Sequence, residues 1–270
     1  MSFRATFWLF LSALAAAAAP GADSIPKPDN VPDITTPKSQ TQLLEKARLA
    51  NDDLYANLKS FVCAEEIQRY KGDLHGSKTH SVDHVSANLS FENGVERYYD
   101  IRQNARTRPD IASIAGAWSE GEFGTLLQQT GRLLETQPVT FVAFETLGQN
   151  PTAIYRFNVS EEESPWELEV GSDHYRVPFT TDVWISVASG EILKIARKSI
   201  AIPAETRISE ITWDVTLGAV DLNGKSWLLP TAAAYSVEYA DSKRREWNEM
   251  SFSGYHRYGS ESSLRFDGFQ

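Results

Sequence analysis

Three histidines, His75, His80 and His84, have the residue type and close spacing that a metal site requires. If His80 and His84 lie on one strand, they point to the same face but stand roughly 13 Å apart along it. One zinc ion cannot bridge that separation in a regular strand. We therefore expect solvent-exposed histidines on a hairpin, and we predict neither a metal site nor a cofactor.

Nucleophilic catalysis would require an activated serine, and Ser119 is the residue to consider. The segment from Gly116 to Gly121 lacks the G-x-S-x-G spacing of a nucleophile elbow. Ser119 has no base beside it in the sequence, although His174 or His256 could reach it through the fold. We predict a loop serine and no catalytic residue, and keep a secreted hydrolase with a non-local site as an alternative.

Paired carboxylates and a single thiol complete the reactive groups. Glu65 and Glu66 fall on a predicted strand, so their side chains face opposite ways and cannot act as a pair on one substrate. Cys63 is the only cysteine, so it has no partner for an intramolecular disulfide. We interpret it as a buried small hydrophobe. A nucleophile or an intermolecular disulfide remains the alternative.

Composition limits the classes of function. The chain has 270 residues, of which 41% are hydrophobic, and this is enough for a substantial core. Its formal net charge is −10. An acidic protein gains nothing from counterion release on nucleic acid, so we predict no nucleic-acid partner.

The N-terminus has the pattern of an export signal. Arg4 precedes an apolar stretch from Phe7 to Ala19 that ends in a run of alanines. We predict a signal peptide over residues 1–19, cleaved near Ala18, with an uncleaved membrane anchor as the alternative. A Pro-rich linker over 20–38 follows, and no later stretch is apolar for long enough to span a membrane. The protein is therefore expected to be periplasmic or extracellular.

Helical periodicity appears twice. Apolar residues recur at steps of three and four from Leu43 to Phe61, after a capping-box pattern formed by Ser39 and Gln42. A second helix is predicted over Glu122–Leu134, after a surface loop that starts at Gln103. The rest of the chain alternates with the period of strands.

Alternating strands and turn residues indicate the fold class. Residues Ile211 to Leu217 alternate strictly between apolar and polar side chains. Turn signals occur at Asn93-Gly94, Ser189-Gly190 and Asn223-Gly224. We predict a mainly β (α+β) domain over 39–270, with about eleven strands and two helices. Its antiparallel sheet is strongly curved and buries one apolar face.

Aromatic side chains on that face could line a pocket for an apolar ligand. Our candidates for lining residues are Phe141, Tyr155, Trp213 and Tyr235. The same residues could equally be ordinary core, because aromatic side chains dominate β cores in general.

Three stretches together resemble a group of uncharacterised exported proteins typical of Acidobacteria. They are Trp118–Gly124, Val183–Ile195 with Trp227–Pro230, and Tyr255–Ser262. The second stretch, W-I-x-x-x-S-G-E-I-L-K-I followed by W-L-L-P, is also similar to the LolA/LppX-like group of outer-membrane lipoprotein-sorting proteins. That resemblance implies a half-open β-barrel with helices at its mouth and a lipid or lipoprotein ligand, and it supplies no catalytic residue. Many relatives carry cysteines around Val237–Arg245, which this chain lacks.

Three functions follow from these observations. The first is a non-catalytic envelope protein that binds an apolar ligand, a lipid or an acylated protein, in a concave sheet. The second is a structural or protein-interaction module with a packed core and no ligand. The third is the secreted hydrolase.

Overall fold

The computed structural model describes residues 34, 36–58, 61–74, 78–92 and 95–257. The predicted signal peptide, most of the linker, His75, the Asn93-Gly94 turn and the end of the last resemblance motif lie outside these residues. The helices and strands are α1 (Pro37–Leu58), β1 (Phe61–Asp73), β2 (Thr79–Glu92), β3 (Val95–Gln103), β4 (Arg106–Thr107), α2 (Thr125–Thr136), β5 (Thr140–Leu147), β6 (Asn150–Val159), β7 (Glu167–Val170), β8 (Asp173–Arg176), β9 (Phe179–Ser186), β10 (Ile192–Ser199), η1 (Ala204–Thr206), β11 (Ile208–Leu222), β12 (Lys225–Tyr239) and β13 (Arg244–Arg257).

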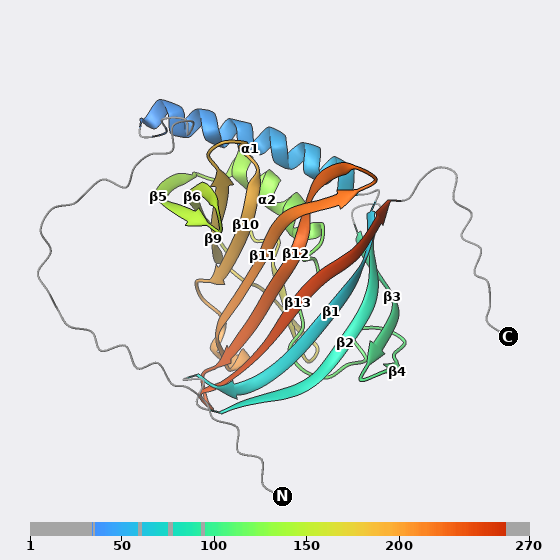
Figure 1. Ribbon diagram of the computed structural model, residues 1–270. Coiled ribbons are helices and arrows are strands. Elements are labelled where there is room, and N and C mark those ends of the chain that lie inside the picture. The colour runs from blue at the N-terminus through green and yellow to red at the C-terminus, as the bar shows by residue number, and fades with distance from the viewer. Residues whose placement is uncertain (1–33, 35, 59–60, 75–77, 93–94, 258–270) are drawn as a thin grey trace, which may run out of the picture. The chain divides into compact units, whose positions relative to one another are not determined.

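Eleven strands form one antiparallel sheet in the order β4-β3-β2-β1-β13-β12-β11-β10-β9-β6-β5 (Figure 1). Strand β1 pairs with β13, so the first and last strands of the chain lie side by side within the sheet. The sheet is curved and its edges, β4 and β5, do not pair with each other, while β7 and β8 form a separate hairpin. The predicted fold class is confirmed.

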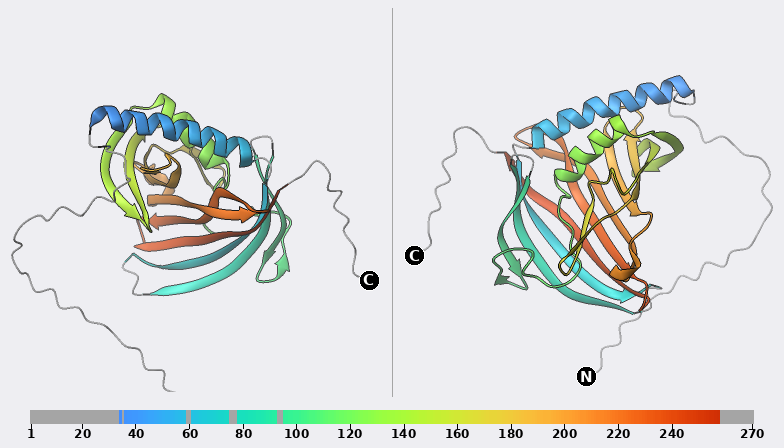
Figure 2. Two further views of the ribbon diagram at one scale, coloured as in Figure 1. Left: turned by 45° about the horizontal axis from the view of Figure 1, so that its top comes forward. Right: turned by 180° about the vertical axis from the view of Figure 1, so that it is seen from behind.

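One face of the sheet is buried over its central strands, whereas the edge strands β4 and β5 have no buried residue. In β1 the buried side chains alternate strictly with half-buried ones from Phe61 to Tyr70, and β11 alternates in the same way. Both helices lie on the concave side, at one end of the strands (Figure 2). The predicted period-two alternation therefore does place one set of side chains in a common interior.

The cap of the first helix lies three residues earlier than predicted, at Thr36, and the helix begins at Pro37. Thr36 and Ser39 form a reciprocal capping box, in which each backbone N–H donates to the other residue's hydroxyl at 3.2 Å. Pro37 occupies the first helical position, where its missing N–H costs nothing. The interpretation of Ser39 and Gln42 as the capping pair was wrong, because the cap and its partner are Thr36 and Ser39.

The second helix begins three residues later than predicted, at Thr125. A carboxyl oxygen of Glu96 on β3 accepts the N–H groups of Gly124 at 2.7 Å and Thr125 at 3.1 Å. A side chain from a distant strand thus satisfies the donors at this helix start. All five predicted apolar positions are buried: Phe123, Leu126, Leu127, Leu133 and Leu134.

The two other predicted hairpin turns are present. Gly190 has φ +79° between β9 and β10, and Asn223 and Gly224 have φ values of +54° and +76° between β11 and β12. Positive φ at both residues is the geometry that favours Asn-Gly in two-residue hairpins. Neither described helix has the combination of length and apolar composition that crossing a membrane demands.

Candidate functional site

The concave face carries a buried arginine that no carboxylate neutralises. Arg197 lies on β10, opposite Thr181 of β9 and Trp213 of β11. Its side chain is only 1% exposed. Its one hydrogen-bonded partner is the neutral Gln129 of α2, whose Oε1 accepts from Nη1 at 2.7 Å. Among the described residues, Arg197 forms no ion pair, and its Nε and Nη2 groups have no hydrogen-bond partner.

Aromatic rings surround this guanidinium. Its central carbon lies 4.7 Å from the ring centroid of Phe179 and 5.7 Å from that of Trp213. Trp166 packs against both of these rings, with centroid separations of 5.6 and 6.1 Å. Burial lowers the pKa of Arg197 to about 9, so the side chain still carries its positive charge at neutral pH.

A second unsatisfied polar group lies beside Arg197. Thr181 is fully buried, and its hydroxyl has no hydrogen-bond partner among the described residues. Cation–π contacts offset only part of the cost of an unpaired buried charge. The arrangement offers hydrogen-bond donors in an apolar setting, which is suited to holding an oxyanion.

A group of buried acids occupies another part of the interior. Glu65 of β1 and Glu122, just before α2, are each 1% exposed and interact electrostatically with each other and with Glu96. Burial and the charge of Glu96 raise the pKa of Glu122 to about 8, and burial with the charges of Glu122 and Glu96 raises the pKa of Glu65 well above its usual range. Glu122 is therefore mostly protonated at neutral pH.

The nearby thiol is chemically quiet. Cys63 is fully buried, and burial together with the charge of Glu65 raises the pKa of its thiol far above the usual value. A thiol that stays protonated is not a nucleophile. The interpretation of Cys63 as a buried hydrophobe is confirmed. Glu65 and Glu66 face opposite ways, as predicted: Glu65 points inward, and Glu66 points outward and pairs with His84 at 2.7 Å.

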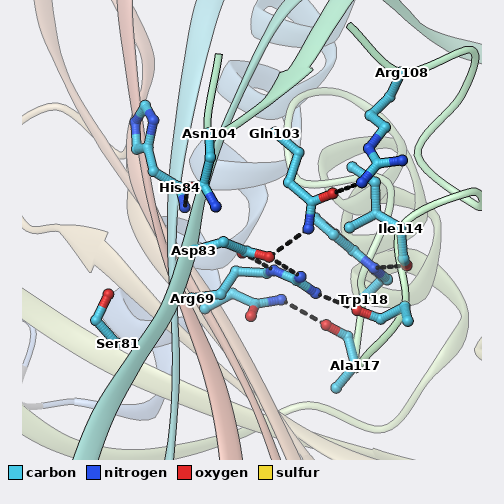
Figure 3. A network of polar contacts seen from close by, with 12 residues as sticks. Arg69, Ser81, Asp83, His84, Gln103, Asn104, Arg108, Ile114, Ala117 and Trp118 are labelled. Atoms are coloured by element: carbon cyan, nitrogen blue, oxygen red, sulfur yellow. Dashed lines mark hydrogen bonds and ion pairs between the residues drawn. The ribbon is translucent and has the colours of Figure 1, made fainter. Parts of the chain in front are cut away.

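A contrasting arginine anchors the loop between β4 and α2 (Figure 3). Arg69 on β1 holds Asp83 of β2 through two bonds, Nε to Oδ1 at 2.6 Å and Nη2 to Oδ2 at 2.5 Å. Its Nη1 donates to the carbonyl of Ala115 at 2.8 Å, and its guanidinium lies 4.4 Å from the Trp118 ring centroid.

The rest of this network extends from Asp83 and from the loop. Gln103 donates to Asp83 at 2.5 Å, and Asn248 of β13 donates to the carbonyl of Ala117 at 2.9 Å. Burial alone would raise the pKa of Asp83, but the hydrogen bonds from Arg69 and Gln103 and the nearby positive charges lower it below its usual value. In this network the donor nitrogens of Arg69 are all hydrogen-bonded to groups of the chain itself, and the contacts hold the loop against the sheet.

Two surface hollows accompany these features. The larger, of about 450 Å³, is lined mainly by side chains whose strand parity places them on the outer face, including Arg156, Asp182 and Lys198. The smaller, of about 210 Å³, lies against the anchored loop and is lined in part by Arg69 and Gly116. Both have charged walls, and Arg197 and Trp213 also line the larger one.

The four predicted lining residues form two cross-strand pairs. Phe141 lies opposite Tyr155 on the edge strands β5 and β6, and Trp213 lies opposite Tyr235 on β11 and β12. Trp213 contacts Arg197, whereas the Tyr155 hydroxyl donates to the Gln40 carbonyl of α1 at 2.8 Å. Their role in binding stays a prediction.

The groups named for a hydrolase do not assemble in the part of the chain that the structure describes. His174 lies exposed on β8 beside Glu169, and His256 lies exposed on β13 with its Nδ1 2.8 Å from the Gly254 carbonyl. Ser119 is half-buried, and its side chain interacts with the buried carboxyl group of Glu122, not with a histidine of the described part of the chain. His80 and His84 are exposed on β2.

The sequence reasoning missed Arg197, although a signal was present. Leu193, Ile195 and Arg197 share one parity of β10, so a charge falls on the buried face. Glu65 and Arg69 do the same on β1, in phase with Cys63 and Ile67. Charged residues in phase with an apolar face mark buried polar positions.

Solved structures that are similar to this chain include the two that follow. No family model matches the chain, and no curated protein matches it. A DUF1329 family protein from Desulfovibrio piger matches over 83% of this chain and 94% of its own, with 8% identity and a TM-score of 0.43. A domain from Vibrio parahaemolyticus, described as an outer membrane lipoprotein-sorting protein, matches over 82% of this chain and 95% of its own, with 9% identity and a TM-score of 0.40. At these identities and TM-scores, neither likeness carries an argument about function. The function must be argued from the side chains of this chain.

Proposed function

We propose that this chain is an exported, non-catalytic protein that binds an apolar ligand, a lipid or an acylated protein, against its concave sheet. One observation carries the proposal. The inner face of an unclosed sheet carries Phe179 and Trp213, and Trp166, which directly precedes the separate β7-β8 hairpin, packs against both rings. Sites for apolar ligands are concave, aromatic and supplied with few polar groups.

The way in which the helices are attached supports this function. Helix α1 is fastened to the strands by the Lys46 ammonium on the Ala188 carbonyl at 2.9 Å and by its Gln40 carbonyl on Tyr155. It is joined to α2 through Asn51, which donates to the Leu127 carbonyl at 3.2 Å, and through Arg48, which donates to the Leu134 carbonyl. A cover of two helices, held by these polar contacts and by buried apolar side chains such as Leu43 and Leu127, can shift to admit a guest more readily than a second packed sheet can.

Export is part of the proposal and rests on residues 1–19. The apolar stretch and the alanine run have the order of a secretory signal. Fractionation of cells that express the full chain would test it, with N-terminal sequencing of the product. Recovery of the intact N-terminus from the cytoplasm would contradict it.

Ligand binding is tested on protein purified without detergent. We expect native mass spectrometry to detect bound lipid, and a fluorescent fatty acid to bind with micromolar or tighter affinity. Quenching of tryptophan fluorescence would place the probe near the inner face. Protein that carries no lipid and ignores the fluorescent fatty acid would refute the proposal.

One observation favours the second candidate, a protein-interaction module. The edge strand β5 exposes Val142 and Phe144 by 42% and 50%. An edge strand with exposed apolar side chains is a template for pairing with another chain. Cross-linking in envelope extracts would support this candidate if Val142→Lys abolished capture of one reproducible partner while lipid binding was absent from the start.

A further inference from the structure

We propose that Arg197 is the binding site for the oxyanion end of the ligand, a carboxylate or a phosphate that is attached to an acyl or alkyl chain. This inference rests on the proposed function and names the chemical class of the ligand. It follows from which atoms of Arg197 are occupied and which are free.

The other buried arginine shows what is absent at Arg197. Arg69 uses Nε and Nη2, the two donors on one edge of its guanidinium, to hold both oxygens of a carboxylate. Its Nη1 donates to a neutral carbonyl. In Arg197, as in Arg69, Nη1 donates to a neutral oxygen, here that of Gln129. The Nε and Nη2 groups of Arg197 have no partner among the described residues. The unoccupied edge is the one that binds oxyanions through two parallel bonds.

The aromatic rings around Arg197 favour a ligand whose remaining part is apolar. Phe179 and Trp213 lie within 4.7 and 5.7 Å of the guanidinium carbon, so an oxyanion there would be attached to an apolar body. The Thr181 hydroxyl, opposite Arg197 on β9 and without a partner, can donate a further hydrogen bond.

No resident acid competes for this position. Burial is the cause of the lowered pKa of Arg197, and no carboxylate among the described residues contributes to it. The buried acids Glu65 and Glu122 interact with Glu96, not with Arg197. The charge of Arg197 is therefore available to a ligand.

The experiment compares three probes that share one chain: tetradecanoate, tetradecyl phosphate and 1-tetradecanol. Each is titrated below its aggregation limit against the full mature chain, with displacement of a bound fluorescent fatty alcohol as the readout. We expect the wild-type protein to bind at least one oxyanion tenfold or more tightly than the alcohol. The ranking of carboxylate and phosphate tells which source of oxyanion the site prefers.

Variants then assign the preference to Arg197. Arg197→Gln should bind all three probes with affinities within about threefold of each other and keep the wild-type affinity for the alcohol. Arg197→Lys should keep part of the preference, because it retains the charge but loses the two-donor edge. The matched control is Arg156→Gln, an exposed outer-face arginine paired with Asp182 at 2.6 Å, which should behave as wild type.

The outcomes separate the two proposals. Equal binding of all three probes by the wild-type protein, which requires no variant to fold, would overturn the anion site and leave the apolar-ligand function standing. A preference that survives Arg197→Gln would also overturn it. If no probe binds, the proposed function fails, and the anion site fails with it.

Discussion

The two buried arginines on the concave face have the same chemistry and opposite circumstances. Arg69 is 4% exposed, and its partners are a carboxylate, a loop carbonyl and the face of Trp118. Arg197 is 1% exposed, and its partners are one amide oxygen and two aromatic faces. An arginine whose donor nitrogens all have hydrogen-bond partners stabilises the fold. An arginine with unpaired donors in an apolar interior is the better candidate for binding a ligand.

We expect the largest effect from replacing Arg69, the arginine whose donor nitrogens all have hydrogen-bond partners. Arg69→Met leaves Asp83 buried without its cation and releases the Ala115 carbonyl, so we expect the free energy of unfolding to fall by about 3 to 5 kcal/mol. Urea denaturation measures it. The double variant Arg69→Met, Asp83→Leu should recover a large part of the loss, because no charge is then stranded. A single variant as stable as wild type would show that the pair contributes nothing.

The buried acids extend the comparison to pH. The pKa of Glu122 is near 4.5 when the chain is unfolded and about 8 when it is folded. Its stabilising contribution is therefore complete below pH 4.5 and is lost as the pH rises through 8. We expect the free energy of unfolding to fall by roughly 3.5 kcal/mol between pH 5 and pH 8. Glu122→Gln, measured by thermal unfolding across the same range, should flatten this dependence, and an unchanged slope would contradict the assignment.

The unsatisfied arginine should respond in the opposite direction to Arg69. Arg197→Met removes an uncompensated buried charge at the cost of one hydrogen bond to Gln129, so we expect the ligand-free protein to gain roughly 1 kcal/mol of stability. Urea denaturation of delipidated protein measures this change. A loss as large as that of Arg69→Met would mean that Arg197 serves the fold, and the contrast between the two arginines would disappear.

Two buried threonines give the smallest and sharpest version of the comparison. Thr181→Val replaces a hydroxyl that has no partner, so stability should stay the same or rise by about 0.5 kcal/mol. Thr152→Val removes a bond to the Glu145 carbonyl of 2.8 Å and should cost about 1 kcal/mol. The difference between the two melting temperatures tests whether the hydroxyl of Thr181 is free in the ligand-free protein.

Much of the fold could be predicted because its signals are local. Alternation in Ile211–Leu217 identifies the buried face of β11, and Asn223-Gly224 identifies the turn that follows it. The helix starts were less predictable. The start of α2 depends on a tertiary contact, and two alternative capping pairs lie close together in the sequence at the start of α1. Glu96, which accepts the first N–H groups of α2, lies almost thirty residues before it in the chain.

The candidate site could be predicted only in part. Trp213 was expected on the inner face and does lie beside Arg197. Arg197 itself was recognisable as an inward charge by its parity with Leu193 and Ile195. Strand parity indicates that a charged side chain is buried, but it does not indicate whether an oppositely charged side chain lies beside it.

The sequence by itself determined which side chains face the interior, because a strand turns successive residues to opposite faces whatever lies around it. It also placed the partners of Arg69 within reach, since Asp83 lies on the next strand of the same hairpin. Only the tertiary structure decided that β1 joins β13, and that α2 brings Gln129, and no carboxylate, to Arg197. The physical reason is distance along the chain: which groups meet across 68 residues depends on how helix and sheet pack together.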